Sequence, residues 1–112
     1  MKNELTTNTA LTTRKGVRKY LEEYHVYTEL MYDRADYDTA IDLVDFHNAV
    51  LMADLTDKQV LFVRYAMQGY TTREIGEKVD LKHNSVNDTI NRACDKIAEI
   101  YQEWQRQEAV SA

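Results

Sequence analysis

Apolar and polar residues follow one another along this chain with the three- and four-residue spacing of amphipathic helices. The first such stripe predicts a helix from about Thr12 to Arg34. Its apolar and aromatic members are Val17, Tyr20, Leu21, Tyr24, Tyr27, Leu30 and Met31. A basic cluster occupies the opposite face near the start: Arg14, Lys15, Arg18 and Lys19. This cluster is either a contact for DNA phosphates or an acidic partner, or simply a solvated helix start.

A turn over Asp33–Asp38 separates this helix from a second one, which we expect to end near Ala53. Asp38 or Thr39 is the predicted N-cap, because a side-chain oxygen there accepts hydrogen bonds from the first free N–H groups of a helix. The residues predicted to face inward are Ile41, Val44, Phe46, His47, Val50 and Leu51.

Two capping boxes mark the starts of two further helices. Thr56 with Gln59 opens a helix over Asp57–Gln68, and Gly69 follows at the C′ position that ends many helices. This helix is expected to direct Val60, Leu61, Val63 and Tyr65 inward. Thr71 with Glu74 opens a short helix over Thr72–Val79.

The last predicted helix is the longest uninterrupted stripe in the sequence. A turn over Asp80–His83 precedes it, and the helix is expected from about Asn84 to Gln107. Its apolar positions keep the helical period over several turns. They are Val86, Ile90, Ala93, Ile97, Ile100 or Tyr101, and Trp104.

These elements predict an all-α protein, a helical bundle with a C-terminal helix-turn-helix. The 112 residues suffice for one modest core, and a sequence with no proline and three glycines has few helix breakers. We divide the chain into an N-terminal helical segment, 1–54, and a helix-turn-helix domain, 55–107. The two N-terminal helices offer a surface for a protein partner or for a homo-oligomer.

Charge is distributed unevenly along the chain, whose formal net charge is −5. Residues 1–57 carry six Lys or Arg and eleven Asp or Glu, whereas residues 58–112 carry eight of each. The acidic excess therefore lies outside the helix-turn-helix. Since phosphate contacts supply much of the affinity for nucleic acid, a neutral domain should bind DNA weakly and with strong dependence on salt.

Several classes of function find no support in the sequence. No apolar run approaches the roughly 18 residues of a membrane span, and the polar start after Met1 does not resemble a secretory signal. A single cysteine, Cys94, suits a reducing compartment, so a cytoplasmic location is expected. No metal-ligand spacing, nucleotide-binding loop or catalytic motif occurs, and we expect neither enzyme activity nor a cofactor nor a metal.

The helix-turn-helix prediction depends on residues 69–97. Gly76 permits close helix crossing, Ile75 and Val79 face inward, Leu81 fills the turn, and Val86 with Ile90 anchors the following helix. Such a unit presents one helix to the major groove of double-stranded DNA. The polar residues expected to be exposed there are Lys82, His83, Asn84, Ser85, Asn87, Asp88, Asn91 and Arg92. Asparagine can pair with adenine, and arginine with guanine or phosphate.

Residues 55–97 resemble region 4 of bacterial sigma factors. The similarity comprises Leu55-Thr56 with Gln59, Gly69-Tyr70-Thr71, Glu74-Ile75-Gly76, and a valine-anchored helix ending in Arg92-Ala93-Cys94-Asp95-Lys96-Ile97. This resemblance implies recognition of a promoter element and contact with bacterial RNA polymerase. It implies that His83, Asn84, Ser85, Asn87 and Asp88 lie over bases, and Arg73, Lys82 and Arg92 nearer the backbone. Small proteins of this type resemble phage and prophage transcription regulators.

The chain departs from that family in three respects. Its candidate recognition helix is poor in arginine, Lys82 replaces the usual capping residue so that the helix start shifts toward Asn84, and residues 1–54 do not resemble a core-binding region. Two alternatives stay open. One is a DNA-packaging protein resembling the phage terminase small subunit; a measured mass corresponding to eight or more subunits would favour it. The other is an interaction module that mimics region 4 without binding DNA.

Overall fold

The computed structural model describes residues 11–34 and 36–111, and in these ranges it contains helices and no strand. The helices are α2 (Arg14–Arg34), α3 (Tyr37–Met52), α4 (Asp57–Met67), α5 (Thr72–Val79) and α6 (His83–Ser111). The predicted all-α class is therefore confirmed. None of these helices is both long and apolar enough to cross a bilayer. The first residues, which argue against a secretory signal, lie outside the described ranges.

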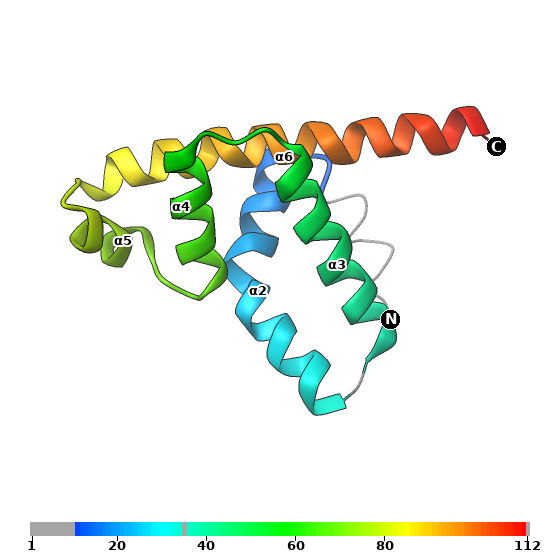
Figure 1. Ribbon diagram of the computed structural model, residues 1–112, viewed down its shortest axis with the longest axis horizontal. Helices are drawn as coiled ribbons and strands as arrows, with labels where there is room; N and C mark the ends of the chain where they lie inside the picture. Colours follow the sequence, from blue (N-terminus) through cyan, green and yellow to red (C-terminus); the bar gives the residue numbers. More distant parts are fainter. Residues whose placement is uncertain (1–10, 35, 112) are drawn as a thin grey trace.

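The long α6 helix contacts each of the other four described helices (Figure 1). The short α5 lies at one end of α6 and α4 follows; α2 and α3 form an antiparallel pair that meets α6 near its middle and extends away from it. The last turns of α6 extend beyond the other helices, which gives an elongated body of 47 × 34 × 19 Å.

Each helix start has a local chemical cause. The Thr56 hydroxyl accepts from the Gln59 N–H while the Gln59 side chain accepts from the Thr56 N–H, and Thr71 and Glu74 make the same reciprocal pair. Both predicted capping boxes are thus confirmed. Gly69 follows the C-cap of α4 with a φ of 99°, a conformation that side-chain-bearing residues avoid. The predicted end of this helix is therefore also confirmed, within one residue.

The predicted cap of the second helix was wrong by two or three positions. Asp36, rather than Asp38 or Thr39, is the N-cap of α3, and its carboxylate accepts from the N–H groups of Asp38 and Thr39. An aspartate preceding the helix can reach the free N–H groups of the first turn, whereas one already inside the helix cannot.

The start of α6 also differs from the prediction by one residue. The Lys82 carbonyl accepts from the N–H groups of Ser85 and Val86, so the helix begins at His83 instead of near Asn84. Its C-terminal end lies at Ser111, one turn beyond the predicted Gln107. Lys82 therefore precedes the helix as its N-cap residue and accepts these bonds with its backbone carbonyl.

One continuous core joins both halves of the chain. It contains Val17, Tyr20 and Leu21 from α2, Leu43, Phe46 and Ala49 from α3, Phe62, Val63 and Ala66 from α4, Ile75 from α5, and Val86, Ile90, Ala93, Cys94, Ile97, Ala98 and Tyr101 from α6. Tyr20 stacks on Tyr27 and packs against Phe46, with centroid distances of 4.9 and 4.8 Å. The N-terminal helices therefore pack onto the helix that carries the C-terminal half.

The inward faces predicted for α3 and α4 were partly wrong. On α3, Phe46 is buried as expected, but Ile41, Val44 and Leu51 are 53%, 58% and 69% exposed. On α4, Val63 is buried as expected, whereas Leu61 is 43% exposed and Phe62 takes the inward position. Both helices carry apolar residues on more than one face, and contacts with α2 and α6 decide which face is covered.

Candidate nucleic-acid interface

The junction of α5 and α6 is tightly constructed. The N–H groups of Asp80 and Leu81 both donate to the Gly76 carbonyl, and Asp80 adopts a left-handed conformation with a φ of 58°. A Cβ atom on Gly76 would lie 2.5 Å from the Leu81 carbonyl oxygen. The glycine is therefore required for the turn to fold back over α5. The sequence predicted close crossing of two helices at Gly76, whereas the closest atom belongs to the turn. Leu81, predicted to fill the turn, is 38% exposed instead.

The first turns of α6 have one buried face and one exposed polar face. Val86 and Ile90 are 0% and 1% exposed, so the helix is anchored firmly on α5 and α4. Away from this anchor, the exposed residues are Lys82, His83, Asn84, Ser85, Asp88 and Arg92, and Arg73 is exposed on α5. We call these seven residues the polar edge. All seven are exposed, and the start of α6 lies with α5 at one end of the molecule (Figure 1).

Two asparagines expected to be exposed with this edge are half-buried instead. Asn87 and Asn91 are about one helical turn apart on α6, and Asn91 contacts α2. The Asn91 side-chain oxygen accepts a hydrogen bond of 2.6 Å from Arg18 Nη1. This bond fixes the side-chain orientation of Asn91 and leaves its amide nitrogen for other partners. The sequence could not foresee it, since the two residues are 73 positions apart.

A second long-range contact holds α2 against α6. Arg14 donates two hydrogen bonds, of 2.8 and 2.7 Å, to the carboxylate of Asp95. This bidentate pairing lowers the pKa of Asp95 and raises the pKa of Arg14. Because both side chains are about half exposed, water and salt screen the attraction and the pair contributes little to stability.

A cation–aromatic contact joins α5 to the segment between α4 and α5. The Lys78 ammonium lies 4.6 Å from the ring centroid of Tyr70, and the ring of Tyr70 meets Tyr65 edge-on. Through these contacts the segment between α4 and α5 is attached to the outer surface of α5. They add rigidity to the support on which α6 is presented.

The chemistry available at this edge is hydrogen bonding and charge. No group of three or more His, Cys, Asp or Glu within the described ranges could hold a metal ion. Cys94 is fully buried in the core, and burial raises the pKa of its thiol to about 12. Its nucleophilic thiolate is therefore scarce at neutral pH. Amide, hydroxyl, imidazole and cationic groups on an exposed helix start match the groups that read base edges and phosphates.

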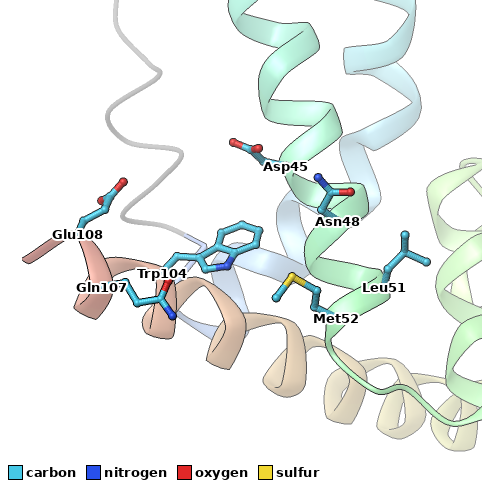
Figure 2. Close-up of a pocket in the computed structure, with 7 residues that line it drawn as sticks. All are labelled: Asp45, Asn48, Leu51, Met52, Trp104, Gln107 and Glu108. Carbon is cyan, nitrogen blue, oxygen red and sulfur yellow. The ribbon is translucent and has the colours of Figure 1, made fainter. Parts of the chain in front are cut away.

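A separate surface lies between α3 and the C-terminal half of α6. A pocket of about 830 Å³ lies there. Figure 2 shows that Trp104 of α6 points toward Met52 of α3 across it. Its lining consists of Asp45, Asn48, Leu51, Met52, Trp104, Gln107 and Glu108. The exposed Ile41 and Val44 extend the same apolar face along α3. Sequence reasoning missed this surface because it placed these α3 residues in the core.

No family model matches the chain, and neither a curated protein nor a solved structure matches it.

Proposed function

We propose that this protein is a DNA-binding transcription regulator similar in mode to sigma region 4. In this proposal α5 and α6 act as a helix-turn-helix, and the first turns of α6 enter the major groove of promoter DNA. The observation that supports it is the polar edge: exposed side chains of the types that bind bases and phosphates, at the start of a helix whose other face is buried. A rigidly held helix positions its side chains well enough to discriminate bases.

Within this edge we assign two roles. His83, Asn84, Ser85 and Asp88, together with the half-buried Asn87, are proposed to face bases. The cations Arg73, Lys82 and Arg92 are proposed to meet phosphates. Asn91, whose side-chain oxygen Arg18 already holds, is proposed to contact DNA through its amide nitrogen. Amide side chains suit adenine in the major groove, whereas cations neutralise phosphates irrespective of sequence.

The regulator is also proposed to contact bacterial RNA polymerase. The supporting feature is the apolar face of α3 with its neighbouring pocket, since contiguous exposed apolar side chains are typical of protein–protein contacts. That face lies along the body of the molecule, away from the α5 end (Figure 1). Polymerase and DNA could then be bound together, and a coupling of about 1.4 kcal/mol would raise promoter occupancy about tenfold.

The direct test is a gel-shift experiment with the duplex flanking the protein's own gene, at two salt concentrations, with and without RNA polymerase. The proposal predicts specific retention that weakens as salt rises and strengthens when polymerase is added. Absence of retention at low salt would exclude DNA recognition.

A matched pair of variants tests the base-facing role. Asn84→Ala and Asn87→Ala should each lose about 1–3 kcal/mol of discrimination between the preferred duplex and a scrambled one. Gln105→Ala is the control, because Gln105 carries an exposed amide side chain in the C-terminal part of α6, far from the polar edge. Unchanged sequence preference in both Asn84 and Asn87 variants would show that a different surface reads DNA.

A second candidate function is an interaction module that binds a protein and no DNA. The α3 face and the net charge of −5 favour it. The gel-shift experiment at low salt separates the two candidates, because the module would capture polymerase or another protein while leaving duplex DNA unshifted.

A further inference from the structure

The start of α2 brings a group of cations to the flank of α6. Four Lys or Arg residues occur between positions 14 and 19, and no acidic residue lies in the first turn of this helix. Cations near the start of a helix are opposed by the helix dipole, so the dipole of α2 does not favour the position of this cluster. A groove of about 610 Å³ runs between this cluster and α6, where Asn91 lines it.

The cations of the cluster fall into two pairs. Arg14 is held by Asp95, and Arg18 is held by Glu22 and Asn91. Lys15 and Lys19, one helical turn apart, are exposed and make no ion pair with any residue that the structure describes. The arginines therefore join α2 to α6, and the lysines remain available for an anion.

The groove lies beside α6, the helix that is proposed to enter the major groove, and this position favours DNA phosphates as the anion. A helix about 10–12 Å across fills a major groove about 12 Å wide, so structures flanking that helix meet the sugar-phosphate backbone. Asn91 and Asp95, which α2 contacts, lie two to three turns after the start of α6. Figure 1 shows α2 beginning beside this part of α6.

We propose that Lys15 and Lys19 bind phosphates of the DNA backbone beside the major groove that α6 occupies. This inference rests on the function proposed above and adds a contact that lies outside residues 55–107. It also supplies positive charge that the neutral 58–112 half lacks. The segment before residue 54 then participates directly in DNA binding.

The test compares a double variant, Lys15→Gln with Lys19→Gln, against the parent protein. Binding of one duplex is measured over a range of salt concentrations. Two lost phosphate contacts should reduce the slope of log K against log salt by about 1.8 and weaken binding about 10- to 100-fold near 100 mM salt. The ratio of affinities for preferred and scrambled duplexes should stay the same, because phosphate contacts carry no sequence information.

The matched control is Lys58→Gln with Arg106→Gln, which changes net charge equally at exposed sites on α4 and at the far end of α6. The control should keep the parental slope. Two results would overturn this inference while leaving the proposed function standing. One is a Lys15 and Lys19 variant with parental affinity and parental slope. The other is an equal loss of affinity in this variant and in the control. A parent protein that binds no duplex would overturn the proposed function, and this inference with it.

Discussion

Gly76 lies where α5 passes closest to the chain that leaves it. A Cβ atom there would approach the Leu81 carbonyl oxygen to 2.5 Å, and backbone cannot move aside as a flexible side chain can. Gly76→Ala should therefore lower the free energy of unfolding by about 1–3 kcal/mol, the usual cost of overpacking. Urea unfolding followed by circular dichroism measures it.

Glu77→Ala is the natural control for this substitution. Glu77 is the next residue of α5 and is exposed, so its replacement should change stability by less than about 0.5 kcal/mol. Equal stability of the Gly76 variant and the parent would mean that the turn after α5 follows another path.

At the residue scale, the sequence predicted the role of a residue correctly where that role depends on residues close to it in the chain. Gly69 and the buried Val86 and Ile90 have the roles that their positions indicate. The environment of Asn91 could not be predicted, because its hydrogen-bond partner comes from another helix. Nothing in a local pattern reports a contact across 73 residues.

At the element scale, the cap of α5 determines how the helix before α6 begins. Thr71→Ala removes the hydroxyl that accepts from the Glu74 N–H and should cost about 1 kcal/mol, within a range of about 0.5–2. Thr71→Ser keeps that hydroxyl and should stay near the parent. Thermal unfolding of the three proteins checks the order, and identical melting of the Ala and Ser variants would contradict it.

The helices themselves were predictable, whereas the faces they bury were only partly so. Capping boxes and apolar spacing depend on residues within one turn, and they gave the bounds of α4 and α5 within one residue. In α3 two apolar faces overlap, one with Leu43 and Phe46 and another with Ile41 and Val44. Only packing against α2 and α6 selects between them, so the sequence alone assigned several outward residues to the core.

At the scale of the whole molecule, two phenols lie in the core where α2, α3 and α6 meet. Tyr20 and Tyr101 are 7% and 6% exposed, and burial raises the pKa of each above its usual value. The unfolded chain then loses these protons at lower pH than the folded protein. Stability should therefore be intact below about pH 10, the ordinary tyrosine pKa, and should fall as pH rises beyond it.

Tyr101→Phe tests this dependence. The Tyr101 hydroxyl is buried without a hydrogen-bond partner among the described residues, so its removal should leave stability at pH 7 unchanged or raise it by about 1 kcal/mol. Above pH 10 the variant should lose stability less steeply than the parent. Tyr32→Phe, at a position 81% exposed, serves as the control in urea titrations at several pH values. A Tyr101 variant with the parental alkaline slope would refute the assignment.

The 29 residues of α6 form one unbroken rod of about 43 Å that reaches from the α5 turn past α3. Two ligands held on such a rod cannot adjust their separation by bending a linker. Under the proposed function, the protein would fix the distance between its own DNA site and the polymerase site. The two sites would then have to lie a constant number of base pairs apart, on the same side of the duplex. Inserting about five base pairs, half a turn of the double helix, would turn the two sites to opposite sides of the duplex and abolish joint occupancy.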